Sequence, residues 1–130
     1  PFTACRKGCS HCCNIAALIS DVEAQRIGEA IGRKPVKTGA FPADVPALQK
    51  KYFGVPCTFL KGGRCSIYEV RPLACRLHFS MADDSFFCST KIAPQNSLVP
   101  ALNLQGVDRA LFMMTLGSMH ADIRDFFPKR

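Results

Sequence analysis

The sequence lacks the patterns of a membrane protein and of a nucleic-acid-binding protein. None of its apolar runs approaches the ~20 residues needed to cross a bilayer, and its start does not resemble a signal peptide. Although the formal net charge is +7, the lysines and arginines are scattered, without a run of five or more and with little aromatic interleaving. We therefore expect no membrane span, argue against nucleic acid as a partner, and predict a cytoplasmic protein.

The patterns of several enzyme classes are missing as well. No Gly-rich phosphate loop is present, since Gly62-Gly63 has the setting of a turn, and no Ser-His-Asp arrangement can be built. With 130 residues, 48% of them hydrophobic, the chain is predicted to form one domain over residues 1–130. A chain of this size can bury a core, so its eight cysteines are not required as disulfide staples.

Cysteine is what the sequence has in excess. Cys5, Cys9, Cys12 and Cys13 fall within nine residues. A tight loop of this kind can aim several thiolates at one point, and Zn²⁺ or an iron-sulfur centre each takes about four such donors. Adjacent side chains are expected to diverge, so Cys12 and Cys13 suit two metal ions, or two corners of a cluster, better than one tetrahedron. The spacing Cys5-x3-Cys9-x2-Cys12 also occurs in radical S-adenosylmethionine enzymes, but the chain lacks the length and strand–helix alternation of their barrel.

A second cysteine region follows in the middle of the chain. Gly62-Gly63 between two short apolar runs predicts a β-hairpin, which would bring Cys57 and Cys65 together on adjacent strands. Pro72 is typical of the first position of a helix, and Cys75 would lie one turn inside it. Residues 79–97 look irregular, carry Cys88 and are placed to fold back over the site.

These regions define the candidate metal site. The predicted ligands are Cys5, Cys9, Cys12, Cys13, Cys57, Cys65, Cys75 and Cys88. Two alternatives remain open: an isolated cysteine such as Cys88 can be a small buried apolar residue, and Cys57 and Cys65 can form a disulfide in an oxidising compartment.

Charged and imidazole side chains near the cysteines are candidates for supporting roles. Arg71 and Arg76 are expected to donate hydrogen bonds to thiolates or to carbonyls of the cysteine loops; ion pairs with Glu69 or Asp83 are the alternative. Histidine is weaker evidence. His11 and His78 are possible ligands by position, whereas His120 is expected to be structural.

The remaining elements are predicted to be mainly helical. Ser20 followed by Glu23 forms a capping-box signature, and apolar residues starting at Val22 recur near helical spacing until Gly32. A second helix is predicted over residues 44–53, with Pro46 in its first turn.

Residues 89–130 contain no cysteine. A largely buried helix is predicted over residues 104–120 and a shorter one over 122–127, with the four methionines as core packing. The predicted fold class is a small, mostly helical α+β domain, with a short β-hairpin and cysteine-rich loops around a metal centre.

The two cysteine regions together resemble the CxxCxxCC family of zinc- or iron-chelating domains, bacterial proteins whose relatives include flagellin lysine N-methylases. The matching stretches are Cys5-x3-Cys9-x2-Cys12-Cys13, then Pro56-Cys57-x-Phe59-Leu60, then Cys65-Ser66-Ile67-Tyr68-Glu69-x-Arg71-Pro72-x2-Cys75-Arg76. One extra residue between Cys5 and Cys9 departs from the family pattern. The resemblance implies metal chelation, with the eight cysteines as candidate ligands of zinc or an iron-sulfur cluster.

Three functions follow as hypotheses. The first is a cysteine-ligated metal-binding protein that holds an iron-sulfur cluster or zinc, iron being favoured, and serves as a redox or metal-handling module with metal ions and an unidentified protein as partners. The second is an enzyme, either a metal-dependent oxidoreductase or a protein methyltransferase component, although no S-adenosylmethionine-binding fingerprint accompanies the cysteines. The third is a disulfide-stabilised interaction domain.

Overall fold

The computed structural model describes residues 9–78, 81, 86–96 and 104–130. Helices dominate this part of the chain, and two short antiparallel strand pairs accompany them, as predicted for an α+β domain. In chain order the elements are η1 (His11–Asn14), β1 (Leu18–Ser20), α1 (Asp21–Ile31), α2 (Val45–Tyr52), β2 (Leu60–Lys61), β3 (Arg64–Cys65), η2 (Tyr68–Val70), α3 (Leu73–Leu77), η3 (Phe86–Cys88), η4 (Pro94–Asn96), α4 (Gln105–Met114), β4 (His120–Asp122) and α5 (Ile123–Phe126). The longest described helix, α1, has 11 residues, so none of the described helices can cross a bilayer.

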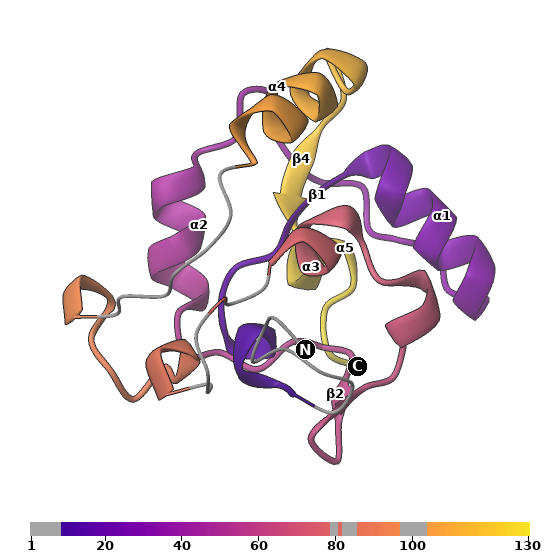
Figure 1. Ribbon diagram of the computed structural model, residues 1–130. Coiled ribbons are helices and arrows are strands. Elements are labelled where there is room, and N and C mark those ends of the chain that lie inside the picture. The colour runs from indigo at the N-terminus through magenta and orange to yellow at the C-terminus, as the bar shows by residue number, and fades with distance from the viewer. Residues whose placement is uncertain (1–8, 79–80, 82–85, 97–103) are drawn as a thin grey trace.

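A strand pair joins the two ends of the described chain (Figure 1). β1 and β4 are antiparallel, with Leu18 opposite Asp122 and Ser20 opposite His120. β1 runs directly into α1 and β4 runs directly into α5, so the pairing also brings these two helices into contact. The N-terminal cysteine loop is thereby anchored to the C-terminal segment.

Helix α1 begins and ends where the sequence predicts. Ser20 Oγ accepts a hydrogen bond from the Glu23 amide at 3.2 Å, and a Glu23 carboxylate oxygen accepts one from the Ser20 amide at 3.2 Å. Gly32 then adopts φ 67°, the left-handed conformation that closes helices at little cost for glycine. The predicted buried face is wrong at Val22, which is exposed, because Ala24 and Ile27 form the stripe that faces the core.

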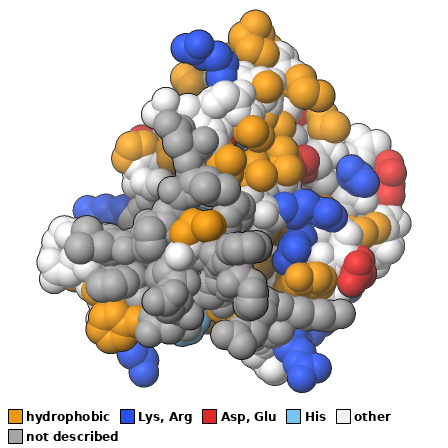
Figure 2. Space-filling model, viewed as in Figure 1, with side chains coloured by type: hydrophobic (Ala, Val, Ile, Leu, Met, Phe, Trp, Pro, Cys, Tyr) orange, Lys and Arg blue, Asp and Glu red, His pale blue; other side chains and the backbone are white. Residues whose placement is uncertain are grey.

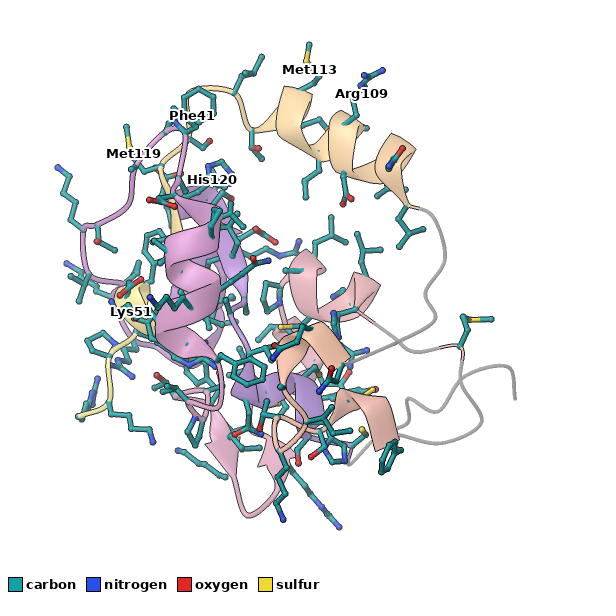
Figure 3. The ribbon with its side chains drawn as sticks, turned by 90° about the vertical axis from the view of Figure 1, so that its left-hand side faces the viewer. Phe41, Lys51, Arg109, Met113, Met119 and His120 are labelled. Carbon is teal, nitrogen blue, oxygen red and sulfur yellow. The ribbon has the colours of Figure 1, made fainter. Side chains whose placement is uncertain are left out.

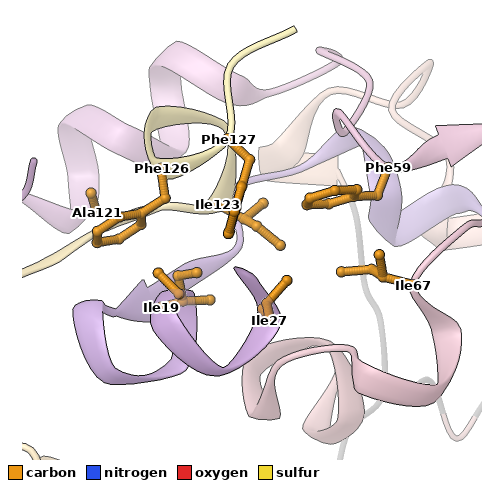
Figure 4. Packing of buried hydrophobic residues seen from close by; sticks show 9 residues of the cluster. Ile19, Ile27, Phe59, Ile67, Ala121, Ile123, Phe126 and Phe127 are labelled. Atoms are coloured by element: carbon orange, nitrogen blue, oxygen red, sulfur yellow. The ribbon is translucent and has the colours of Figure 1, made fainter. Parts of the chain in front are cut away.

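The core lies between α1, α5 and the hairpin (Figure 4). Ile19, Ile27 and Ile123 are almost fully buried, and Phe59 meets Phe127 edge to face with ring centroids 5.3 Å apart. Burying a side chain of this kind contributes about 1.5–3 kcal/mol. Because Cys57 and Cys65 pack against the same cluster, the core also holds the second cysteine region in place.

Local signals correctly predict α2 and the hairpin. Asp44 caps α2 by accepting a hydrogen bond from the Ala47 amide at 3.1 Å. Gly62 and Gly63 both have positive φ, 55° and 73°, as a two-residue hairpin turn requires. Cys57 and Cys65 are nevertheless not on adjacent strands, contrary to prediction, because β3 pairs Cys65 with Leu60 and Cys57 precedes β2.

The prediction for residues 104–120 is wrong in length and burial. Helix α4 ends at Met114, Gly117 then turns with φ 81°, and His120 belongs to β4. Pairing with β1 replaces the helix here, and the amide of Asp21, the first residue of α1, donates to the Met119 carbonyl at 2.8 Å. Asp122 caps the short α5, as expected.

The predicted burial of the methionines is also wrong. Met114 is 84% exposed, and Met81, Met113 and Met119 are exposed as well. Figure 3 shows Met113 and Met119 directed away from the body of the protein, and Figure 2 shows hydrophobic side chains gathered around α4 at the surface. Several large apolar residues of α4 are exposed, so this helix does not bury the apolar face that its spacing predicts.

Candidate metal centre

Six cysteines from three separate segments line one cavity. They are Cys9, Cys12, Cys13, Cys57, Cys65 and Cys75. The cavity has a volume of about 60 Å³, and apolar side chains such as Ile15, Ile67 and Ile123 complete much of its wall. Soft sulfur donors in an apolar setting fit zinc or iron. Within the described ranges, no three Cys, His, Asp or Glu side chains are already drawn together as a ready-made coordination group.

The first cysteine loop is shaped by η1. The Cys13 amide donates to the Ser10 carbonyl at 3.0 Å, and Asn14 Nδ2 donates to the same carbonyl at 3.2 Å. Both Cys12 and Cys13 line the cavity. They do not diverge as predicted, so two adjacent sulfurs are presented to one space.

A direct backbone contact joins the two cysteine regions. The Cys57 amide donates to the Cys13 carbonyl at 2.7 Å, and the Gly54 amide donates to the Asn14 carbonyl at 2.7 Å. Residues that are forty or more positions apart in the sequence therefore form one continuous wall.

Helix α3 delivers Cys75. The helix begins at Leu73, so Pro72 is its N-cap and not its first residue as predicted. Cys75 is the third residue of the helix. The Leu73 amide donates to Glu23 Oε1 at 3.0 Å, while the other carboxylate oxygen of Glu23 caps α1. One carboxylate thus accepts hydrogen bonds from backbone amides at the starts of two helices, and it holds α3 beside the first cysteine loop.

The pKa values of the cavity thiols differ strongly. A hydrogen bond from Cys13 lowers the pKa of Cys12 to about 7, with help from the positive charge of Arg71, and the same bond raises the pKa of Cys13. Burial raises the pKa of Cys75 to about 12, and neighbouring thiolates contribute to this rise. Burial also raises the pKa of Cys57. Ionising these groups together needs a compensating cation, which a bound metal supplies.

The two predicted supporting arginines occupy different places. Arg71 lines the cavity, and its guanidinium lies 3.9 Å from the centroid of the Tyr68 ring. Arg76 is exposed and off the cavity wall; it donates to the carbonyls of Arg71 and Glu69, each at 2.9 Å. Arg76 therefore braces the turn between η2 and α3, with no thiol among its described hydrogen-bond partners.

The other predicted site residues are spread around the cavity. Cys5 lies outside the described residues, and Cys88 is half-buried in η3 without lining the cavity. His78 lines a small adjoining cavity with Cys12 and Cys75, whereas His11 lines neither. His120 pairs in β4 and its Nδ1 lies 2.9 Å from the Ser118 carbonyl. No disulfide occurs among the seven described cysteines, so the alternative Cys57–Cys65 bridge is not formed.

Sequence reasoning missed a buried ion pair at the cavity, Asp122 with Arg124. Asp122 is fully buried and Arg124 is 7% exposed, and their side chains meet at 2.8 Å. Arg124 also lines the cavity. The available signal was an Asp-x-Arg sequence with apolar Ala121 and Ile123 beside it, because charged residues that are buried are usually paired.

The fold and the cavity define a small cysteine-cluster domain of the metal-chelating class. A family model described as a putative zinc- or iron-chelating domain, CxxCxxCC, matches residues 4–95, which is more than half of the chain. The chain belongs to the CxxCxxCC family, as its motifs predict. Comparison with curated proteins and with solved structures finds no significant match.

Proposed function

We propose that this protein holds a metal centre in the six-cysteine cavity and serves as a redox or metal-handling module, with an iron-sulfur cluster favoured over zinc. The observation that carries this proposal is the arrangement of six thiols from three segments around one space. The zinc- or iron-chelating description of the family supports it. Cys5 and Cys88 remain predicted ligands.

The number of thiols favours a centre with more than one metal ion. A single zinc ion takes four protein donors, and six line this cavity. If all six were thiolates, Arg71 on the wall would offset one of their six negative charges, since Asp122 already balances the charge of Arg124. The remaining excess of five negative charges is more than one divalent ion can balance.

The size of the cavity argues against the methyltransferase alternative. Sites for organic ligands usually enclose about 300–1,000 Å³. The cysteine cavity encloses about 60 Å³, which accommodates metal ions but no organic cosubstrate. The metal-handling function therefore fits the site better than methyl transfer does.

Metal analysis of protein purified without oxygen tests the proposal. We expect at least one equivalent of iron plus zinc; an iron-sulfur cluster would add a brown colour and sulfur-to-iron charge-transfer absorption, whereas zinc would add neither. Because iron can be lost in air, an aerobic preparation serves as a comparison. Less than about half an equivalent of total metal in the anaerobic protein would refute the proposal.

A further inference from the structure

The side chain of Arg124 reaches the backbone of both cysteine regions. Its Nη2 donates to the carbonyls of Cys13 at 3.2 Å, Ile15 at 2.9 Å and Val55 at 2.8 Å, and its Nε donates to Pro56 at 3.3 Å. The first two carbonyls belong to the loop that carries Cys12 and Cys13. The other two belong to the segment that leads directly into Cys57.

The guanidinium is held in this position from behind. Its Nη1 lies 2.8 and 2.9 Å from the two carboxylate oxygens of Asp122, and its plane lies over Tyr52 at 4.8 Å from the ring centroid. Asp122 is itself fixed, because it accepts hydrogen bonds from the amides of Ala17 at 2.7 Å and Arg124 at 2.8 Å. Arginine suits this role since its rigid fork can serve several acceptors at once.

Arg124 lies in α5, outside the residues 4–95 that match the family model. The family pattern therefore does not account for it, and its location on the cavity wall does not follow from the cysteine motifs. Through Arg124, the C-terminal segment connects the loop that carries Cys12 and Cys13 to the segment that leads into Cys57.

We propose that Arg124 is a positioning residue of the metal centre, which joins the Cys9–Cys13 loop to the segment entering Cys57. The inference rests on the proposed metal-binding function. If the arginine is replaced, the four carbonyls lose their shared donor and the two loops are free to move apart. Metal binding then has to reorder them.

Titration of the full-length, reduced protein with Co²⁺ tests this role, since cobalt bound to thiolates gives charge-transfer and d–d absorption that reports the ligand geometry. The test variant is Arg124→Lys, which keeps the positive charge but loses the fork. We expect about 10-fold or greater loss of Co²⁺ affinity, the usual size of effect for residues that orient metal ligands, together with an altered d–d spectrum. Far-UV circular dichroism checks that the variant is folded.

Arg33→Lys is the matched control. Arg33 also donates to a backbone carbonyl of the C-terminal segment, that of Pro128, but it does not line the cavity. This variant should keep both the affinity and the spectrum of the unmodified protein. This control shows whether losing an arginine-to-carbonyl contact away from the cavity alters Co²⁺ binding.

The outcomes separate this inference from the function on which it rests. If the unmodified protein binds neither Co²⁺ nor native metal, the proposed function fails and this inference falls with it. If the unmodified protein binds Co²⁺ and Arg124→Lys binds it with equal affinity and spectrum, only the positioning role is overturned. Should Arg124→Lys not fold, the double variant Asp122→Asn/Arg124→Gln takes its place, because it removes both charges of the buried pair together, and unchanged Co²⁺ binding in that variant overturns the role equally.

Discussion

Replacing Asp122 by asparagine should strongly destabilise the protein, because it removes the charge that faces buried Arg124. The carboxylate is fully buried and has four hydrogen-bonding contacts, two with the guanidinium and two with backbone amides. Asparagine keeps one oxygen that can accept a hydrogen bond. Its NH2 group, however, would face N–H donors of Arg124 or of the backbone and could not bond to them. Arg124 is left as a buried cation without its counter-charge.

The magnitude can be worked from this geometry. Removing one partner of a buried ion pair costs about 3–5 kcal/mol, and the oxygen that remains places this substitution near 3 kcal/mol. Domains are stable by only about 5–15 kcal/mol, so the loss is a large share of the total. With a urea dependence of about 2 kcal/mol per molar, the unfolding midpoint should fall by roughly 1.5 M.

Asp125→Asn provides the matched control, since it makes the same chemical change three residues later. Asp125 accepts hydrogen bonds from Lys51 at 3.0 Å and Tyr52 at 2.5 Å, and both its carboxylate and Lys51 are partly or largely exposed (Figure 3 labels Lys51). Exposed ion pairs contribute about 0–1 kcal/mol, so this variant should lose no more than about 1 kcal/mol. Urea denaturation followed by far-UV circular dichroism measures both. Equal shifts of the two midpoints would refute the assignment of Asp122–Arg124 as the main buried pair.

Other predictions follow from the site and the hairpin. Cys75→Ser should lower the metal content of anaerobically purified protein more than Cys88→Ser does, as measured by elemental analysis, because Cys75 lines the cavity and Cys88 does not; equal losses would contradict this. In metal-free, reduced protein, burial raises the pKa of Cys75 from about 8.5 in the unfolded chain to about 12, so its neutral thiol favours the folded state below pH ~8.5 and this stability is lost as the pH rises toward 12. Because the lowered pKa of Cys12 contributes in the opposite direction, urea midpoints at pH 7 and 10 are compared between the unmodified protein and Cys75→Ser. The change from pH 7 to pH 10 should be less favourable to the unmodified protein, and an equal or more favourable change would be inconsistent with the sign. Gly63→Ala should cost about 1 kcal/mol, since φ is 73° and no atom crowds the added methyl group, whereas Gly106→Ala in α4 should be neutral or stabilising by up to about 1 kcal/mol; thermal unfolding compares the pair, and a neutral Gly63→Ala would contradict the strain argument.

Local chemistry explains which elements were predictable. The capping box at Ser20 and Glu23, the aspartate cap of α2 and the Gly62-Gly63 turn each act over a few residues, so the sequence contains the whole interaction. The β1–β4 pair has three residues in each strand, too few to show a pattern, and its partners are about 100 residues apart. The helix predicted over residues 104–120 therefore extends into β4 at His120.

The sequence by itself determined the chemistry of this protein. Eight cysteines in two spaced groups, with no pattern for phosphate, membrane or nucleic-acid binding, indicate a soft-metal domain, and family membership agrees. Spacing along a chain limits which sulfurs can meet only within a loop, so it could not decide that Cys13, Cys57 and Cys75 share one cavity. That was decided by tertiary contacts: the core that seats the hairpin, the carboxylate of Glu23 that holds α3, and Arg124, whose hydrogen bonds to distant carbonyls exist only once the two ends of the chain have paired.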